Sequence, residues 1–426
     1  MTVNLLSRRE FLAAAAAAIP LSAAQGNTID VDKVRARYHE AEHLLRALVV
    51  RLPFCDKPVL ATTPGASSWG AALWAETSML EGLLFARYDP EVALGTHEIF
   101  FNTQRPDGLM PAVILAKVPD WLSDHFEFGQ IRQMVPIART AWELSRRLKD
   151  EAFLARAYQS CSRFEDWITA HRNTRGTGMV EMFCEFDMGL DNGQPTVEGI
   201  HGWCPNHNAA NVVRTQGFPL LAPDLSALVY GGRLALSEMA EALGKHQESQ
   251  RWAQQAEDLR ALIVKYCFDR EDQFFYDVDT DGKFRKFRGT QLFPLCQEHV
   301  LTKEQFRPVW NRYLHNPKEY WVRYPFPSYS IADPHYKPEA NAWTGATFLN
   351  ITIRTLLWMP HYLTPQENQD YMRRWVSGMS NWNSWPTIID PMTGRGFPGD
   401  VWAGLNTVYL TFIEFVDQLG ILKARA

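Results

Sequence analysis

Residues 184–195 read CEFDMGLDNGQP and lie between two long stretches of helical pattern. Three acidic side chains fall within seven residues of this segment, and two glycines and a proline interrupt it. Glycine and proline are typical of turns, so we predict a loop that joins two helices and projects its carboxylates outward. A solvated surface turn has the same composition, so other features must decide whether the loop belongs to a site.

Four tryptophans fall in predicted loops or at the edges of predicted helices: Trp203, Trp343, Trp385 and Trp402. Aromatic faces stack on the C–H groups of sugars, and carboxyl groups move protons at a glycosidic oxygen. An acidic loop together with aromatic side chains therefore indicates a carbohydrate site.

Apolar residues at helical spacing predict about eleven helices of similar length, with long loops at alternating connections. This pattern alone predicts a large all-α protein. The predicted ranges are 31–50, 69–85, 90–101, 131–148, 151–171, 225–243, 248–266, 303–313, 345–359, 365–379 and 401–419.

One strand signal stands out from the helical pattern. Residues 274–278 read FFYDV, Asp281 and Gly282 form a turn signal, and residues 283–287 read KFRKF. We predict a β-hairpin on the surface of the helical body. No linker or low-complexity run follows the N-terminal region, so we expect residues 25–426 to form a single domain.

The acidic loop carries a family resemblance. Residues 187–192 read DMGLDN and resemble the E-S-G-M-D-N-S-P loop of glycoside hydrolase family 63 and its mannosylglycerate-hydrolase-like relatives, and trehalases carry a related loop. The resemblance implies an (α/α)6 barrel of the six-hairpin glycosidase type and places Asp191 in the position of the general acid. Asp187 stands in place of the family's Glu and Met188 in place of its Ser. Asp187 and Asn192 are expected to shape the loop and hold sugar hydroxyls.

Two further segments extend the resemblance. Residues 102–111 read NTQRPDGLMP, similar to the family's pocket-lining Q-x-x-D-G-x-x-P segment, which makes Gln104 and Asp107 substrate-binding candidates. Trp74 and Glu76 lie near the position of the family's Trp-Asp pair, and Glu76 is expected to hold sugar hydroxyls. An ordinary turn and a helix-surface charge are the alternative interpretations of these two segments.

The aromatic floor of the family's pocket also has a counterpart. Residues 341–345 read NAWTG and resemble the family's Y-W-R-G-P segment, with Thr344 in place of its Arg. The resemblance implies that Trp343 and Gly345 lie at the reactive sugar, and that Trp343 and Trp402 form an aromatic platform. The loss of the Arg implies altered contacts in this subsite.

The second carboxyl group of an inverting glycosidase is missing from its expected place. Such enzymes place an acid and a base roughly 6.5–9.5 Å apart, with a water molecule between base and sugar. In the family a Glu precedes a D/N-P-x-T-G turn; here residues 390–394 read DPMTG, but Thr387 occupies the Glu position. A threonine hydroxyl cannot act as a base near neutral pH. Asp390, Asp400 and Glu339 are the replacement candidates, and Asp400 is preferred because it opens the last predicted helix. The alternative is that the substrate itself or a chain of water molecules supplies the base.

Three functions remain open from the sequence. The first is an exported inverting glycoside hydrolase that acts on an α-linked glucoside or mannoside, of oligosaccharide or glycosyl-glycerate type, with no metal or organic cofactor. The second is a glycan-binding relative that has lost its base and turns over weakly or not at all. The third is a sugar epimerase or lyase, enzymes that use His or Tyr as proton carriers; only His201 and His207 point to it.

The overall composition excludes other partners. The chain has 426 residues, of which 46% are hydrophobic and 12% aromatic, enough for a large core. A net charge of −5 provides no basic field for nucleic acid. No run of eighteen apolar residues follows the N-terminal region, so we expect no membrane span in the mature protein.

The N-terminus has the features of an export signal. Residues 7–12 read SRREFL, a twin-arginine pattern, and six alanines, Ile19 and Pro20 follow before small residues at positions 22–24. We predict that residues 1–24 are a twin-arginine signal peptide read by the Tat export machinery, and that the protein is periplasmic or secreted. An Ala-rich first helix is the alternative, and Pro20 argues against it.

The cysteines indicate neither a disulfide framework nor a metal site. No CxxC motif occurs, and twin-arginine cargo folds in a reducing cytosol, so we expect mostly buried thiols. His201, Cys204 and His207 have ligand side chains at short spacing, but no fourth ligand completes them and no metal is expected. The six cysteines are Cys55, Cys161, Cys184, Cys204, Cys267 and Cys296.

Overall fold

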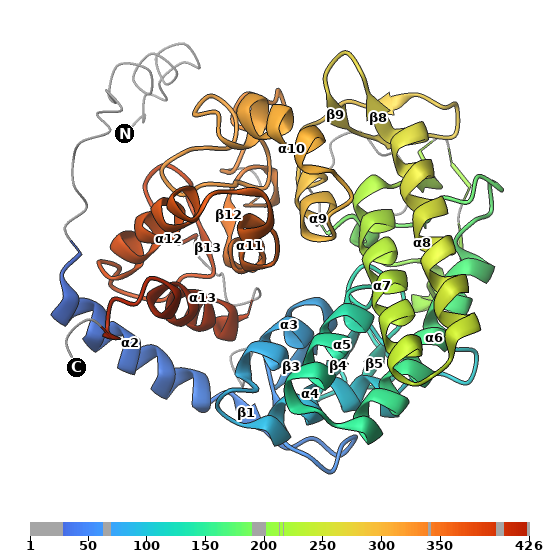
Figure 1. Cartoon of the computed structure of the whole chain (residues 1–426), viewed down its shortest axis with the longest axis horizontal. Coiled ribbons are helices and arrows are strands. Elements are labelled where there is room, and N and C mark those ends of the chain that lie inside the picture. Colours follow the sequence, from blue (N-terminus) through green and yellow to red (C-terminus); the bar gives the residue numbers. More distant parts are fainter. Residues whose placement is uncertain are drawn as a thin grey trace.

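The structure is a computed structural model that describes residues 29–62, 70–189, 202–212, 214–215, 217–339, 342–397 and 404–423. These residues form twelve α-helices, α2 to α13, and thirteen short β-strands (Figure 1). The predicted signal peptide, residues 1–24, lies outside the described residues.

Six helices form a closed inner ring in which each helix contacts the next and the last contacts the first (Figure 1). Apolar residues predominate in α3, α7, α11 and α13, and most side chains of α3 and α13 are buried, whereas α5 is amphipathic. A helix that is hydrophobic on all sides belongs in a core. In ring order they are α3 (Ala75–Phe85), α5 (Ile137–Leu148), α7 (Pro223–Ala242), α9 (Leu292–Gln297), α11 (Leu349–Tyr362) and α13 (Leu405–Gln418).

An outer layer of helices covers the ring. α2 (Val31–Arg46) packs on α13, α4 (Pro90–Asn102) on α3, and α6 (Glu151–His171) on α5. α8 (His246–Cys267) packs along α7, and α12 (Pro365–Met379) packs against α11 and α13. α10 (Lys303–Val309) continues into a π-helical turn, Trp310–Leu314. Two concentric layers of paired helices confirm the predicted (α/α)6 barrel.

Several helices begin or end where a short strand interrupts the predicted pattern. α3 begins at Ala75 because β3 (Ala72–Trp74) precedes it, and α11 begins at Leu349 because β12 (Thr347–Phe348) precedes it. α9 was not predicted, since six residues containing a proline show no helical period.

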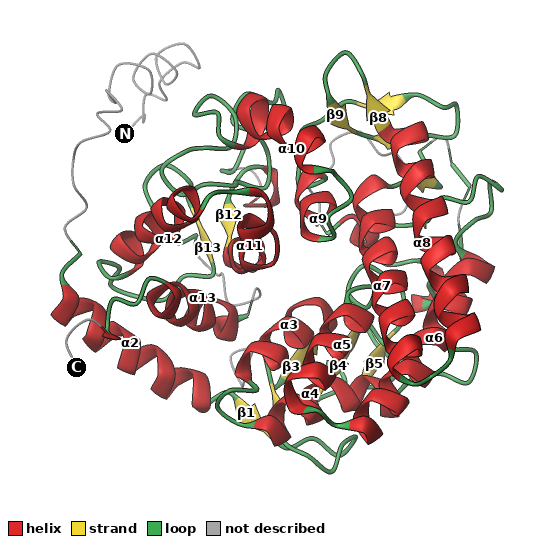
Figure 2. Cartoon of the chain, in the orientation of Figure 1, coloured by secondary structure: helices red, strands yellow, loops and turns green. Residues whose placement is uncertain are grey.

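Five small sheets lie among the helices (Figure 2). β10 (Asp277–Val278) pairs with β11 (Phe284–Arg285), which confirms the predicted hairpin pairing. The surface position was wrong: residues 274–278 are buried, because β10 also pairs with β7 (Leu220–Leu221) in a four-stranded sheet that ends at β6 (Glu181–Met182). The other pairs are β1 (Val49–Val50) with β2 (Val59–Leu60), β3 with β4 (Val113–Leu115), β4 with β5 (Phe126–Glu127), β8 (Phe268–Asp269) with β9 (Phe274–Phe275), and β12 with β13 (Ile388–Ile389).

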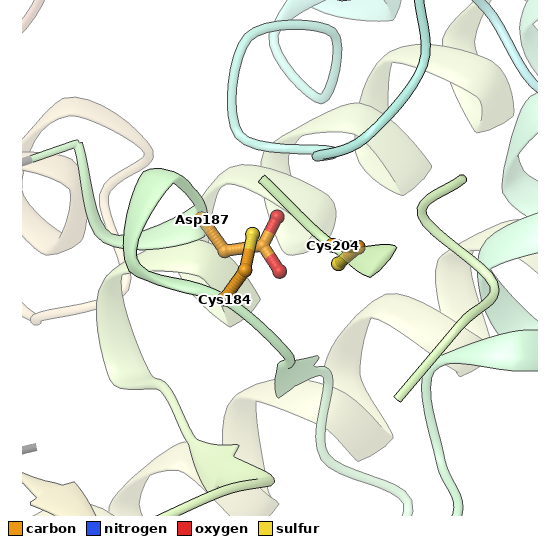
Figure 3. Close-up of side chains that lie close together, drawn as sticks. All are labelled: Cys184, Asp187 and Cys204. Carbon is orange, nitrogen blue, oxygen red and sulfur yellow. The ribbon is translucent and has the colours of Figure 1, made fainter. Parts of the chain in front are cut away.

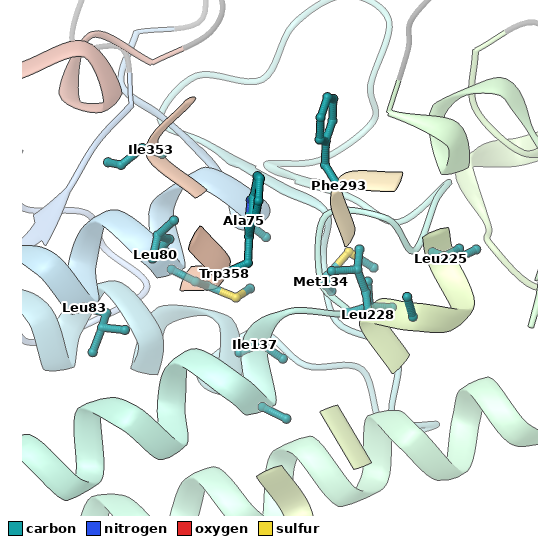
Figure 4. Close-up of a cluster of buried hydrophobic side chains, with 14 of the residues drawn as sticks. Ala75, Leu80, Leu83, Met134, Ile137, Leu225, Leu228, Phe293, Ile353 and Trp358 are labelled. Atoms are coloured by element: carbon teal, nitrogen blue, oxygen red, sulfur yellow. The ribbon is translucent and has the colours of Figure 1, made fainter. Parts of the chain in front are cut away.

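The hydrophobic core fills the space between the inner helices and beneath the outer layer. Figure 4 shows part of it, where side chains of α3, α5, α7, α9 and α11 meet. Large side chains contribute much of this burial, and Trp252, Trp310, Trp358 and Trp375 are fully enclosed. Within the described residues, no helix combines the length and hydrophobicity needed to cross a membrane.

Candidate active site

A pocket lies at the end of the ring where α3 and α11 begin, and its empty volume, open solvent included, is about 420 Å³. Its walls come from α9, from the first turns of α3 and α11, and from the loops that lead into inner helices. The lining residues are Glu76, Arg132, Gly189, Thr290, Phe293, Pro294, Gln297, Trp343, Asn350, Ile351 and Arg354.

Glu76 lies between two arginines in this pocket. Its Oε1 is 3.1 Å from Nη2 of Arg354 and 3.7 Å from Nε of Arg132. Arg354 also donates to the Glu76 carbonyl at 3.0 Å and to Oε1 of Gln297 at 3.2 Å. The pocket wall thus presents a fixed carboxylate acceptor beside guanidinium donors, an arrangement suited to polar hydroxyl groups.

Arg132 connects the pocket wall to the acidic loop. Its Nη1 lies 2.5 Å from Oδ2 of Asp224 and also donates to the Met188 carbonyl at 3.3 Å. Gly189 follows with φ of 69°, and a Cβ there would lie 3.3 Å from the Arg132 guanidinium. The loop backbone therefore runs directly against Arg132, which favours glycine at this position.

A buried acid lies behind Arg132. The Asp277 carboxylate is buried, and desolvation, followed by the neighbouring Asp224 charge, raises its pKa well above the ordinary range.

Asp187 anchors the acidic loop from inside. It lies in the 3-10 turn Glu185–Met188, is fully buried, and forms an ion pair with the equally buried Arg172. Its oxygens also accept from the backbone N–H groups of Ile131, at 2.8 Å, and Phe183, at 2.9 Å. Asp187 therefore holds the start of the loop to Ile131 and Phe183, and its carboxylate does not line the pocket. Asp191 and Asn192 lie outside the described residues, two and three positions beyond the pocket residue Gly189.

Trp343, predicted as part of the aromatic floor, lies at the pocket. Its ring lines the pocket and stacks on Phe348 with ring centroids 3.7 Å apart. Gly345 has φ of 147°, and a Cβ there would lie 2.6 Å from the Tyr336 ring, so its role is close packing. Trp74, half-buried, precedes α3 and does not line the pocket. Trp402 lies outside the described residues.

Gln104 and Asp107 close their own turn instead of lining the pocket. Gln104 donates to the carbonyls of Gly108, at 2.8 Å, and Ser160, at 2.9 Å, which ties the turn to α6. Asp107 accepts from the Leu109 N–H at 3.1 Å and pairs with Arg105 at 2.7 Å.

The candidates for the second carboxyl group differ in position. Thr387 is fully buried, and its carbonyl accepts from the Leu349 N–H at 3.0 Å, beside the pocket. Asp390 accepts three hydrogen bonds from Met392 and Thr393 and so closes its turn. Glu339 is exposed, and neither acid lines the pocket. Asp400 lies outside the described residues, within which Glu76 is the one pocket-lining carboxyl group.

Sequence reasoning missed Arg132, Gln297, Asn350 and Arg354. Arginine and amide side chains within a helical pattern are typical of solvent-exposed positions, and no neighbouring residue in the sequence marks these four as pocket-lining. Asn350 adds a polar atom to the pocket, because its Oδ1 is buried and accepts no hydrogen bond within the described residues.

One group of side chains has ligand types suited to a metal. Cys184, Asp187 and Cys204 place their ligand atoms within 4.8 Å of one another (Figure 3). The Asp187 oxygens already accept hydrogen bonds, and the Arg172 cation lies beside them, so a metal ion fits poorly. His207 instead contacts Glu127 at 2.9 Å, and burial raises the pKa of Glu127 to about 7. His201 lies outside the described residues.

Comparisons with known proteins bear on the family and the fold of the chain. The family model of the mannosylglycerate hydrolase MGH1-like glycoside hydrolase domain matches residues 70–403. A curated relative, an uncharacterized protein of Borreliella burgdorferi, is 21% identical over 133 residues, which cover 30% of this chain and 28% of the relative.

Solved structures share the fold. A GH63 mannosylglycerate hydrolase from Thermus thermophilus, in complex with Tris and D-glycerate, superposes with a TM-score of 0.70 at 16% identity, over 89% of this chain and 99% of that one. The neutral trehalase Nth1 from Saccharomyces cerevisiae gives 0.63 at 15% identity, over 85% and 74%.

Proposed function

Because the chain belongs to the MGH1-like glycoside hydrolase family, which makes it a glycoside hydrolase, we propose that it cleaves an α-linked glucoside or mannoside with inversion. The proposed substrate is an oligosaccharide or a glycosyl-glycerate.

The observation that carries this proposal is the composition of the pocket. Glu76, Arg132 and Arg354 provide polar partners on one wall, and Trp343 provides an aromatic face. A pyranose needs both, because its hydroxyls seek hydrogen bonds while its C–H face stacks on aromatic rings. We assign Glu76 to the sugar hydroxyls and Trp343, with Trp402, to the platform.

Asp191 is the proposed general acid. The loop that carries it passes the pocket at Gly189, so the acidic segment continues from the pocket wall. Asp191 would protonate the leaving oxygen, while a second carboxylate draws a proton from water on the opposite face of the sugar. Asp400 is our proposed base, because it shortly precedes α13, whose second residue, Asn406, is buried within the ring.

The arginines bear on the substrate class. Arg354 is paired with Glu76 and Arg132 with Asp224, so the pocket charges are largely matched, as suits a neutral sugar. The Arg132 Nε is nevertheless buried without a hydrogen bond within the described residues. It faces Oε1 of Glu76 at 3.7 Å, longer than a hydrogen bond, so a small shift of this side chain would let it donate to a substrate hydroxyl or carboxylate oxygen, and the latter suits a glycosyl-glycerate.

A second candidate is a weakly active relative that mainly binds its glycan. Thr387 at the position of the family's base favours it, since a missing base costs a factor of about 10² to 10⁴ in rate. Turnover measurements separate the two candidates.

We further propose export through the twin-arginine route, on the strength of the SRREFL segment at residues 7–12. A reporter fused behind residues 1–24 should reach the periplasm, and replacement of Arg8 and Arg9 by Lys should retain it in the cytoplasm. Export of the Lys variant would contradict this proposal.

The function is tested by sugar release. The chain from residue 25 onward is incubated with α-glucosides, α-mannosides, glycosyl-glycerates and trehalose. We expect release from one class, lowered about 10²- to 10⁴-fold in Asp191→Asn and Asp400→Asn. Asp390→Asn is the matched control, because that carboxylate closes a turn. Equal release by wild type and Asp191→Asn would overturn the assignment of the acid.

A further inference from the structure

Two buried cysteines bracket the acidic segment. Cys184 and Cys204 are 0% and 2% exposed, and their sulfur atoms lie within 4.8 Å of each other. Figure 3 shows both gathered at Asp187, with Cys204 on a separate piece of chain. Residues 185–203, which include Asp191, lie between them in the sequence.

The two ends of this segment are already joined by other contacts. The Phe186 N–H donates to the Gly202 carbonyl at 3.2 Å, and the Gly202 N–H donates to Glu185 Oε2 at 3.1 Å. The rings of Phe186 and Trp203 meet edge to face with centroids 4.5 Å apart. A disulfide needs its sulfur atoms about 2.05 Å apart, so these two sulfur atoms must approach each other by less than about 3 Å for the bond to form.

We propose that Cys184 and Cys204 form a disulfide when the protein meets a disulfide oxidant, closing the segment that carries Asp191. The two thiols lose two electrons and two protons as their sulfur–sulfur bond forms. The oxidant's disulfide bond breaks, and its sulfurs take up the electrons and protons as two thiols.

A disulfide fits the surroundings better than a metal ion does. Cys184 Sγ is 3.5 Å from the Gly129 carbonyl, and Cys204 Sγ is 4.0 Å from Arg172 Nη2. The third potential ligand, Asp187, is engaged by Arg172, whose positive charge opposes a bound cation. A neutral disulfide has no such conflict with the guanidinium.

Burial sets the expected rate of oxidation. Desolvation raises the pKa of the Cys184 thiol well above its ordinary value, so this sulfur is a slow nucleophile in the folded protein. Oxidation should therefore take hours in the folded chain. An exported protein has that time in an oxidising compartment, but the chemistry of the pair does not depend on the proposed hydrolysis.

The test is a thiol map. The chain from residue 25 onward is incubated with oxidised glutathione, denatured with N-ethylmaleimide and digested. We expect a cross-linked peptide pair containing Cys184 and Cys204, with the other four cysteines alkylated. The apparent Tm should rise by about 3–4 °C, the shift expected for closing a loop of about 20 residues, and fall back with dithiothreitol.

Matched variants separate the bridge from general oxidation. Cys204→Ala should abolish the Tm rise, and Cys55→Ala, at a half-buried cysteine elsewhere, should keep it. Alkylation of both Cys184 and Cys204 after oxidation and after refolding in glutathione buffer would overturn the proposal. So would a glutathione adduct on one of them alone, or stoichiometric zinc bound by the pair. The map is read without substrate, so its outcome is independent of whether the enzyme turns over.

Discussion

The guanidinium of Arg354 lies 3.1 Å from the carboxylate of Glu76. Arg354 is on α11 and Glu76 on α3, two inner helices that α13 separates in the ring. Arg354 also donates to Gln297 at the end of α9, so one side chain connects three helices in the wall of the pocket. The ion pair between Arg354 and Glu76 therefore both lines the pocket and joins inner helices of the barrel.

Glu76→Gln should weaken both catalysis and stability. The amide keeps the shape but loses the charge that holds Arg354 and Arg132. Because a hydrogen bond to a charged group contributes about 1.5–3 kcal/mol, we expect kcat/KM to fall roughly 10- to 150-fold. Steady-state kinetics on the active substrate provide the measurement. Glu339→Gln is the control, since Glu339 is exposed, and an equal loss in both variants would contradict the assignment.

Trp343→Ala should raise KM more than it lowers kcat. The indole provides the aromatic face of the pocket, and such contacts contribute about 0.5–1.5 kcal/mol beyond their buried area, a roughly 2- to 12-fold change in KM. Trp382 is the matched control, because it is half-buried and contacts Tyr324 outside the pocket lining. An unchanged KM in Trp343→Ala would remove the platform from the site.

Gly231→Ala should destabilise the barrel strongly. A Cβ on this residue of α7 would lie 1.8 Å from Oε2 of the buried Glu298, whereas at Gly232 the nearest atom is 3.2 Å away. We expect Gly231→Ala to lower the free energy of unfolding by about 1–3 kcal/mol or more.

Gly232→Ala is the control for this overpacking. Its contact is milder, and it gains up to about 1 kcal/mol of helix propensity. Urea unfolding gives the free energy of unfolding of both variants. Equal values for Gly231→Ala and Gly232→Ala would show that Glu298 does not lie against Gly231.

Glu81 should make stability depend on pH. Burial raises its pKa to about 8 in the folded chain, only partly offset by the hydrogen bond from Thr407. In the unfolded chain a Glu side chain has a pKa of about 4.3, so below that pH the contribution of protonated Glu81 to the free energy of unfolding is fully present. It falls by about 1.4 kcal/mol per pH unit until the folded group ionises near pH 8.

The Glu81 effect is isolated by a variant that cannot ionise. Glu81→Gln should lose less stability than wild type between pH 5 and about pH 8, measured as urea unfolding free energies. Glu127 and Glu165, whose pKa values burial raises to about 7, contribute equally to both proteins and cancel. Parallel curves for the two proteins would contradict the raised pKa.

The longer helices could be predicted because amphipathic helices such as α2 and α12 repeat apolar residues at helical spacing over their whole length. Strands of two or three residues, such as β12, and the six-residue α9 are too short to leave such a pattern. The ring closure itself needs contacts between distant helices, and only the family resemblance anticipated it.

The site was harder to predict because its residues come from separate elements. Glu76 and Trp343 were identified through the resemblance and do line the pocket. Arg132 and Arg354 were not, since a buried arginine paired across helices looks in sequence like any surface charge. Gln104 and Asp107 match a family segment in sequence, but their side chains form hydrogen bonds within their own turn and, from Gln104, to α6, so they do not line the pocket.

The most direct test is the anomer first released by the enzyme. Proton NMR in the first minutes of hydrolysis of an α-linked substrate should show the β-anomer of the sugar, before mutarotation, with release lowered at least about 100-fold in Asp191→Asn. Initial release of the α-anomer, or full release by Asp191→Asn, would contradict an inverting glycosidase with Asp191 as its acid.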